Sequence, residues 1–415
     1  MALGPPTQIA NISPHNAAGP AQNKDILLRQ GRDTMKKQII AALLLAACIG
    51  SLAPHAAAEE TASPVEIQAK AGLLMELETG TILYEENAHE QLEPASVTKV
   101  MTMLLVTEAI DSGTLSLDDM VTTSAYAASM GGSQVFLEEG EQMTVNDMLK
   151  AVAVASGNDA AVALAEHLKG SETAFVDAMN QRAQELGMAD THFCNCTGLP
   201  AEGHVTSAYD IALMSRELLS HDLIRNYTGI WMDTLRNGAF QLANTNKLIY
   251  YYDGATGLKT GSTQAAGFCI SASAKRDGME LIAVVLGSET SADRFESAKA
   301  MLNYGFGGWA MTDIQPEENI PAVPVTLGEQ DTVQPVLEGT SRMLLSKDQA
   351  GLVTTQISVA ESVQAPVQKG DVLGTLQVYV GEELVQELPL KAETAVPRRT
   401  FGSIFREMLY DMVLC

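Results

Sequence analysis

Strand-like segments lie at both ends of a long helix-like region, and this arrangement limits the folds that the chain can adopt. Residues 71–90 (AGLLMELETGTILYEENAHE) have the pattern of two strands joined at a Thr-Gly turn. Residues 267–287 (GFCISASAKRDGMELIAVVLG) have the pattern of a β-hairpin that turns at Asp-Gly. Between them, residues 100–113 and residues 148–168 each predict a helix, the second apolar on most faces and therefore buried. The sequence predicts an α+β fold, in which an antiparallel sheet carries helices and a helical subdomain is inserted.

The pattern changes after about residue 311. Helical periodicity stops, prolines become frequent, and short alternating runs such as LGTLQVYV and ELVQELPL predict strands. We therefore expect a first domain over residues 59–311 and a small all-β domain over residues 312–398.

Residues 399–415 have the clearest amphipathic pattern in the chain. From Phe401 to Val413, apolar residues recur at i, i+3, i+4, i+7, i+8, i+11 and i+12, which predicts a helix with one continuous apolar stripe. Arginines in the preceding linker suit a helix that lies on a bilayer. Docking onto the chain's own domain is the alternative, and we favour anchoring to a membrane surface.

The first 58 residues are predicted to be removed. Residues 35–60 begin with two lysines, continue with a short apolar run and reach small residues before Glu59, which is the layout of a secretory signal cleaved after Ala58. Residues 1–34 have no pattern of their own, so we expect Met35 to be the true start. Lipidation at Cys48 is the less favoured alternative. The expected location is the outer face of the bacterial cytoplasmic membrane.

Composition excludes some classes of function. The 415 residues carry a formal net charge of −25, which argues against nucleic-acid binding, because phosphate contacts need a basic surface. The five cysteines do not form a disulfide framework, and Cys194 and Cys196 are too close in sequence for an easy bridge. The seven histidines show no metal-ligand spacing. We expect neither a metal nor another cofactor.

Three short motifs carry the chemistry. PASVTKVMT places Ser96 and Lys99 one turn apart at the start of an apolar helix, ASGNDAA contains Ser156 and Asn158, and GLKTGST contains K-T-G at residues 259–261. Taken singly, each has an ordinary explanation: a chance match, a loop turn, or a solvated lysine before a bend. Together and in this order they match the S-x-x-K, S-x-N, K-T-G signature of penicillin-recognising serine enzymes.

Ser96 and Lys99 are the expected nucleophile and general base. A helix start exposes the Ser96 hydroxyl near the positive end of the helix dipole, and Lys99 lies on the same helix face. Burying an ammonium group is costly, so we expect burial and a second cation, Lys259, to lower the pKa of Lys99. A neutral lysine can then take the hydroxyl proton.

The remaining motif residues suit proton transfer and substrate binding. Ser156 can relay a proton toward the leaving group, and Asn158 can hold the base or the substrate amide. Gly261 lets a peptide substrate lie along the edge of the sheet as an added strand. The backbone N–H groups of Ser96 and Ser262 would form the oxyanion hole.

The chain resembles the D-alanyl-D-alanine carboxypeptidases among the low-molecular-mass penicillin-binding proteins, of the DacA and DacF type in peptidase family S11. The resemblance runs from about Glu66 to Cys415 and includes LEPASVTKVMT, VASGNDAAVALAEH, THFCNCTGLP, HVTSAYDIALM, GLKTGST and AKRDGMELIAVVLG. It implies a β-lactamase/transpeptidase-like catalytic domain, a β-rich second domain and a C-terminal amphipathic membrane helix.

The resemblance also implies roles for individual residues. The family's nucleophile, base, second-motif and third-motif residues match Ser96, Lys99, Ser156, Asn158, Lys259 and Thr260. The family's carboxylate-binding arginine matches Arg294. The expected substrate-binding set is therefore Lys259, Thr260, Gly261, Ser262 and Arg294. Ser262 stands where relatives often have a bulkier residue, and Cys194 and Cys196 stand where relatives usually have other residues.

The resemblance implies a serine-type D-Ala-D-Ala carboxypeptidase. Ser96 would attack the D-Ala–D-Ala carbonyl of a peptidoglycan pentapeptide stem, release D-Ala and be freed by water, and β-lactams would trap Ser96. A DD-endopeptidase and a catalytically weak wall-binding scaffold remain alternatives. A class A β-lactamase is disfavoured, because the E-x-x-L-N loop that it needs is not found. The β-rich domain is interpreted as a pedestal rather than a docking surface.

Overall fold

The computed structural model describes residues 65–339 and 341–414. The predicted signal segment, Met35 and Cys48 lie outside these residues. The chain divides after Ser63, and all described residues belong to the second unit.

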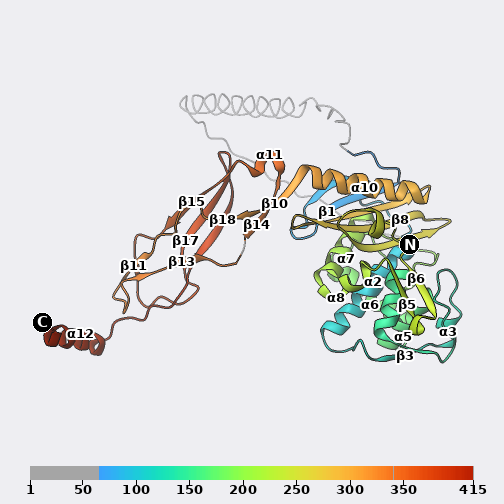
Figure 1. The fold of residues 1–415 in the computed structure, drawn as a ribbon, viewed down its shortest axis with the longest axis horizontal. Coiled ribbons are helices and arrows are strands. Elements are labelled where there is room, and N and C mark those ends of the chain that lie inside the picture. The colour runs from blue at the N-terminus through green and yellow to red at the C-terminus, as the bar shows by residue number, and fades with distance from the viewer. Residues whose placement is uncertain (1–64, 340, 415) are drawn as a thin grey trace, which may run out of the picture. The chain divides into compact units, whose positions relative to one another are not determined.

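A five-stranded antiparallel sheet has the strand order β2-β1-β9-β8-β7. Figure 1 labels two of its strands, β1 and β8, near α10. Its strands are β1 (Ala71–Glu76), β2 (Ile82–Glu86), β7 (Ala255–Thr263), β8 (Gly267–Arg276) and β9 (Met279–Ser288). The two strand pairs that the sequence predicts meet in one sheet because β1 pairs with β9. The K-T-G motif lies on β7, which is an edge strand.

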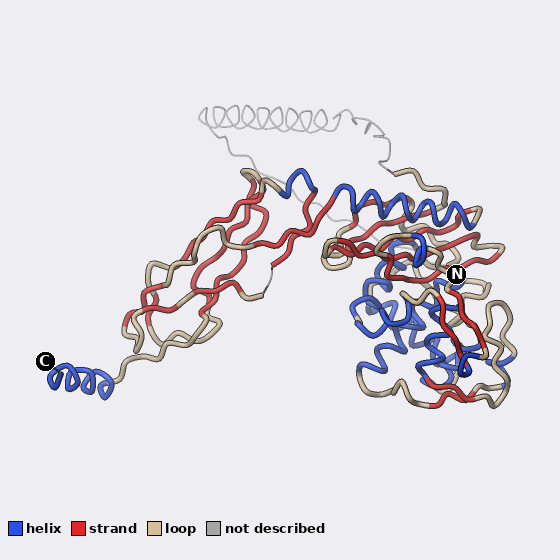
Figure 2. Tube along the Cα trace, in the orientation of Figure 1, coloured by secondary structure: helices blue, strands red, loops and turns tan. Residues whose placement is uncertain are grey.

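Both faces of this sheet are covered. Leu73 and Val284 enter an apolar core shared with the inserted helices, whereas Leu74 and Val285 enter a second core that contains residues of α10 (Ser291–Gly308). Successive strand residues point to opposite faces, so this alternation packs the sheet between α10 and the helical subdomain (Figure 2). The predicted α+β class with an inserted helical subdomain is confirmed.

The inserted region differs from the prediction in one helix. Its helices are η1 (Ala95–Thr98), α2 (Lys99–Asp111), α3 (Ala125–Ala128), α4 (Val145–Ala155), α5 (Asn158–Lys169), α6 (Glu172–Glu185), α7 (Ala208–Ser220), α8 (Asp222–Thr228), η2 (Arg236–Gly238) and α9 (Leu248–Tyr251). The single helix predicted over residues 148–168 is wrong: it is two helices, α4 and α5. The chain breaks at Ser156, whose φ is +62°. Apolar spacing continues across the break because both helices are buried, so periodicity does not reveal it.

Two short ribbons that the sequence does not predict complete this region. They are β3 (Met120–Thr122) with β4 (Gln142–Thr144), and β5 (Met232–Leu235) with β6 (Phe240–Ala243).

Residues after α10 form β structure, as predicted. The elements are β10 (Trp309–Ile314), β11 (Val323–Thr326), β12 (Thr332–Val333), β13 (Pro335–Leu337), β14 (Ser341–Ser346), α11 (Lys347–Ala350), β15 (Val353–Val359), β16 (Val363–Gln364), β17 (Val372–Val380) and β18 (Glu383–Ala392). The LGTLQVYV and ELVQELPL runs lie in β17 and β18 and fill a core with Leu376, Val378 and Leu390. Strand β10 runs across the boundary expected at residues 311 and 312.

The C-terminal residues form helix α12 (Phe401–Leu414). Several of its large apolar side chains are exposed: Phe401, Ile404, Phe405, Met408, Leu409 and Met412. In the part of the chain that the structure describes, no helix is both long enough and apolar enough to cross a membrane.

Candidate active site

Ser96 and Lys99 lie side by side where η1 leads into α2. The Lys99 Nζ donates a hydrogen bond to Ser96 Oγ at 3.0 Å and another to the backbone carbonyl of Thr197 at 2.6 Å. The first distance is in the range that a base needs to take the proton of a nucleophile.

The Lys99 side chain is fully buried. Burial lowers its pKa from 10.5 to about 7, while nearby Cys196 and Asp159 act in the opposite direction. At this pKa about half of the molecules hold a neutral amine near pH 7, so the base form is available under ordinary conditions.

Lys259 on β7 is equally buried, and its pKa is also well below the usual value. Burial is the main cause, followed by the charges of Lys99 and Arg294. The sequence predicts that burial and Lys259 together lower the pKa of Lys99. Burial is the largest cause at Lys99, and the repulsion between the two lysines disfavours having both of them charged. The Lys259 Nζ donates to the carbonyl of Thr260 at 3.0 Å.

Ser156 and Asn158 lie at the break between α4 and α5. The left-handed backbone of Ser156 ends α4, a conformation that is uncommon for a residue other than glycine and is often found at functional sites. Asn158 Nδ2 donates to the carbonyl of Gly131 at 2.6 Å. Its Oδ1 is buried and has no hydrogen-bond partner among the described residues, so this acceptor suits an incoming N–H group.

The K-T-G strand packs directly against the backbone of η1. A Cβ atom at Gly261 would lie 2.7 Å from the Ser96 nitrogen and 2.9 Å from the Pro94 oxygen. A glycine at this position is expected to give a substrate access to the strand edge, and it also permits the close approach of the two backbones. Thr260 Oγ1 donates to Thr245 Oγ1 at 2.7 Å, and Ser262 follows at an exposed position.

Arg294 reaches the K-T-G strand from α10. Its side chain is buried, and its Nη1 donates to the backbone carbonyls of Gly261 at 3.1 Å and Cys269 at 3.2 Å. Burial lowers its pKa to about 10. These bonds support the strand backbone, and a direct contact of Arg294 with a substrate carboxylate stays a prediction.

Sequence reasoning did not identify the segment that accepts a hydrogen bond from Lys99. Thr197 supplies the carbonyl, and Gly198, with φ +82°, lies so close to η1 that a Cβ atom there would collide with the Ala95 carbonyl. A glycine within THFCNCTGLP is the one local signal of this contact. Cys194, Cys196 and Cys269 are free thiols. Cys194 is half-buried and the other two are buried.

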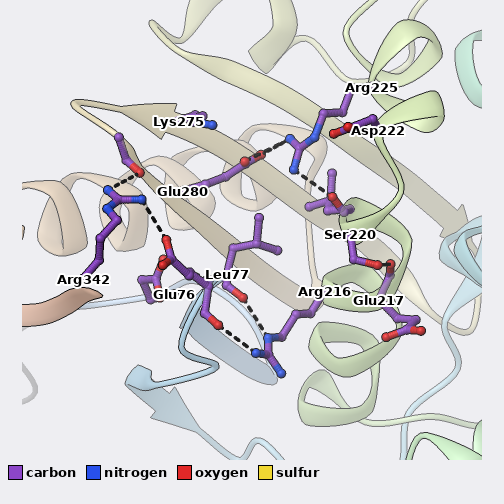
Figure 3. A pocket seen from close by; sticks show the side chains of 13 residues that line it. Glu76, Leu77, Arg216, Glu217, Ser220, Asp222, Arg225, Lys275, Glu280 and Arg342 are labelled. Atoms are coloured by element: carbon purple, nitrogen blue, oxygen red, sulfur yellow. Dashed lines mark hydrogen bonds and ion pairs between the residues drawn. The ribbon is translucent and has the colours of Figure 1, made fainter. Parts of the chain in front are cut away.

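A cavity of about 470 Å³ lies away from the motif residues (Figure 3). Within it Arg225 pairs with Glu280, Arg342 pairs with Glu78, and Arg216 donates to backbone carbonyls of the β1–β2 turn. Because these charges neutralise one another, the cavity is a weaker candidate for catalysis than the site around Ser96.

Comparisons with known proteins identify the family of the chain. A family model described as D-alanyl-D-alanine carboxypeptidase, Peptidase S11, matches residues 58–290, and one described as penicillin-binding protein 5, C-terminal domain, matches residues 314–398. The D-alanyl-D-alanine carboxypeptidase DacF of Bacillus subtilis is 41% identical over 90% of this chain and 98% of its own.

Solved structures show the same likeness. Penicillin-binding protein 5 of Haemophilus influenzae is 29% identical, with a TM-score of 0.68 over 80% of this chain and 98% of its own. Penicillin-binding protein D2 of Listeria monocytogenes in the ampicillin-bound form is 34% identical, with a TM-score of 0.51 over 58% of this chain and 98% of its own. Since the S11 model covers more than half of the sequence and DacF aligns almost end to end, the chain belongs to the D-alanyl-D-alanine carboxypeptidase family, peptidase S11.

Proposed function

We propose that the protein is a serine-type D-Ala-D-Ala carboxypeptidase that removes the terminal D-Ala from peptidoglycan pentapeptide stems and binds penicillin at Ser96. The observation that carries this proposal is the fully buried Lys99, with its amine 3.0 Å from Ser96 Oγ and its pKa lowered to about 7. Such a pair is suited to acyl transfer.

The proposed reaction has two stages. Ser96 Oγ attacks the carbonyl carbon of the penultimate D-Ala while Lys99 accepts the hydroxyl proton, and the N–H groups of Ser96 and Ser262 stabilise the oxyanion. The C–N bond then breaks, and the leaving D-Ala takes a proton relayed through Ser156. A water molecule hydrolyses the acyl-enzyme and restores the Ser96 hydroxyl.

Substrate binding is proposed to use the edge of β7. A stem peptide would add to this edge as a strand, with its terminal carboxylate near Lys259 and Thr260 and with Arg294 supporting it. The buried, unpaired Oδ1 of Asn158 would accept a substrate N–H. Because β-lactams mimic the substrate and also present an amide carbonyl, they would acylate Ser96, as expected of a relative of the ampicillin-bound Listeria protein.

The proposed place of action is outside the cytoplasm, where peptidoglycan lies. We propose export by the signal segment before Ala58 and attachment of α12 to the membrane surface, supported by the exposed apolar residues of that helix. The β-rich domain would act as a pedestal between the catalytic domain and the membrane surface.

The test is intact-protein mass spectrometry after mixing the full chain with penicillin, beside a Ser96→Ala variant. We expect a covalent adduct on the parent protein and none on the variant. An assay of D-Ala release from an acyl-D-Ala-D-Ala peptide identifies the reaction. Cleavage of cross-linked peptides without free D-Ala would favour an endopeptidase, and a folded parent without adduct or turnover would favour a wall-binding scaffold.

A further inference from the structure

The side chain of Asn195 organises the backbone segment that lies against Lys99. Its Oδ1 accepts from the N–H of Thr197 at 3.1 Å, the N–H of Gly198 at 2.7 Å and the hydroxyl of Thr197 at 3.0 Å. Its Nδ2 donates to the carbonyl of Leu199 at 2.9 Å. One half-buried amide thus makes four hydrogen bonds within a segment of five residues.

The peptide unit between Thr197 and Gly198 joins Asn195 to Lys99. Its N–H donates to Asn195 Oδ1, and its carbonyl accepts from Lys99 Nζ at 2.6 Å. The C=O and N–H of a trans peptide lie in one plane and point in opposite directions. Holding the N–H therefore fixes the direction of the carbonyl, and polarisation along this chain of hydrogen bonds strengthens both of them.

The same segment is held against η1 and α2 by other contacts. Thr102 Oγ1 donates to the carbonyl of Cys196 at 2.6 Å, and Gly198 approaches the Ala95–Ser96 peptide too closely for any side chain. These contacts set where the segment lies. Apart from the bond that Lys99 itself makes, the hydrogen bond from the Gly198 N–H to Asn195 Oδ1 holds the orientation of the Thr197–Gly198 peptide.

The orientation of the Thr197 carbonyl matters for a lysine that acts as a base. A neutral amine has two N–H groups and one lone pair, and the lone pair must face Ser96 Oγ to accept its proton. An N–H group of the amine must then point away from Ser96 and donate to another acceptor. The Thr197 carbonyl is that acceptor.

We propose that Asn195 is a positioning residue that aims the Lys99 amine at Ser96 through the Thr197–Gly198 peptide. The inference rests on the proposed function, in which Lys99 is the base. Asn195 itself touches neither the substrate nor the reacting atoms in this scheme.

Three other groups act on Lys99. Asp159 on α5 and Lys259 on β7 lie on other elements, whereas Cys196 follows Asn195 in the same segment. A well-aimed carbonyl favours the charged ammonium. Loss of Asn195 should therefore reduce the limiting acylation rate and also move the acid limb of the pH profile to lower pH.

The test compares three variants of the full chain by the pH dependence of acylation with a β-lactam. Asn195→Leu removes the acceptor, and Asn195→Asp keeps it but adds a negative charge. Asn180→Leu is the matched control, because Asn180 makes a similar pair of 2.8 Å bonds to the backbone of Phe193, at the start of the same loop.

For Asn195→Leu we expect a limiting acylation rate lower by about tenfold and an acid limb moved down by about half a pH unit. Asn195→Asp should keep the limiting acylation rate and move the acid limb to higher pH, because the added negative charge favours the ammonium form of Lys99. Asn180→Leu should leave the limb in place. Thermal unfolding of each variant separates these effects from loss of folded protein.

An acid limb that stays in place in Asn195→Leu, or that moves equally in Asn180→Leu, overturns the proposal. If Asn195→Leu does not fold, Asn195→Asp decides, since an unmoved limb in that variant also contradicts it. If the parent forms no acyl-enzyme, the proposed function fails by itself. Titration of the Lys99 amine by NMR in the unmodified protein and in the same variants then tests the effect of Asn195 separately.

Discussion

At the scale of the residue, the site depends on a lysine that is removed from water. Lys99 would be charged in solvent and useless as a base, and its complete burial is what brings its pKa to about 7. The carbonyl of Thr197 accepts an N–H group of this amine at 2.6 Å, and Ser96 Oγ lies 3.0 Å from the amine nitrogen. Residue type, burial and these contacts support the base function that we propose for Lys99.

Acylation of Ser96 by a β-lactam should rise with pH through about 7 and then level off. Below this value Lys99 is protonated and cannot accept the hydroxyl proton, and above it the amine is neutral. Lys99→Arg stays charged at every accessible pH, so it should lose at least about 100-fold in rate throughout. Second-order acylation rates between about pH 5 and pH 9 test this. A pH-independent parent rate would contradict the assignment.

Gly198→Ala and Gly203→Ala form a matched pair. Both glycines have φ near +80°, but a Cβ at Gly198 would collide with Ala95, whereas a Cβ at Gly203 would meet nothing within 4 Å. We expect a loss of about 1 kcal/mol in the free energy of unfolding for Gly203→Ala, and about 3 kcal/mol with loss of acylation for Gly198→Ala. Urea unfolding measures both, and equal losses would show that the close approach is unimportant.

At the scale of the element, the break between α4 and α5 shapes the site. Because the chain turns at Ser156 and restarts at Asn158, the second motif lies at a helix end instead of in a helix interior. Asp159, in the first turn of α5, is buried, and its carboxylate accepts from the backbone N–H groups of Val135 and Leu137. This carboxylate therefore fixes the loop at residues 135–137. That loop follows Gly131, whose carbonyl accepts from Asn158.

Asp159→Ala should destabilise the protein by about 2 to 4 kcal/mol, because it leaves the buried N–H groups of Val135 and Leu137 without an acceptor. Asp177→Ala, on the exposed face of α6, is the control and should change the free energy of unfolding by less than about 0.5 kcal/mol. Chemical denaturation distinguishes them.

The charge of Asp159 also raises the pKa of Lys99, so its removal should move the acid limb of acylation to lower pH. Asp159→Asn, measured beside the parent, gives this shift with the side-chain shape retained. A limb that moves to higher pH would mean that the carboxylate does not act on Lys99 as a negative charge.

At the scale of the whole molecule, a catalytic fold, a β-rich region and an amphipathic helix follow one another along the chain. The two family models match the first and second of these parts. Helix α12 leaves Phe401 84% exposed, together with further apolar residues on the same helix. An isolated apolar stripe of this kind is suited to the surface of a bilayer.

Removal of residues 399–415 should abolish binding to lipid vesicles and leave acylation unchanged. The full chain should sediment with phosphatidylglycerol-containing vesicles, and the truncated chain should stay in the supernatant. Phe405→Glu, which places a charge in the apolar stripe, should act like the truncation. A full chain that stays in the supernatant would contradict membrane attachment by α12.

The sequence by itself determined the elements whose evidence is local. Apolar spacing and turn residues predict the strands at 71–90, the hairpin at 267–287 and the helix at Lys99–Asp111. Both signals depend only on residues that are near one another in the chain. The motif residues were found in the same way, because the three motifs are short and occur in a fixed order.

Only the tertiary structure decided which distant segments meet. The carbonyl of Thr197 is 98 residues from Lys99 in sequence, and Gly261 and Gly198 each approach η1 from a separate part of the chain. The break at Ser156 is not visible in the apolar spacing, because both helices are buried, although Gly157 beside it is a local turn signal. Apolar periodicity reports which face of an element is buried, but it does not report what that face is buried against. The low pKa of Lys99 depends on that second fact, because desolvation is a property of everything that surrounds the amine.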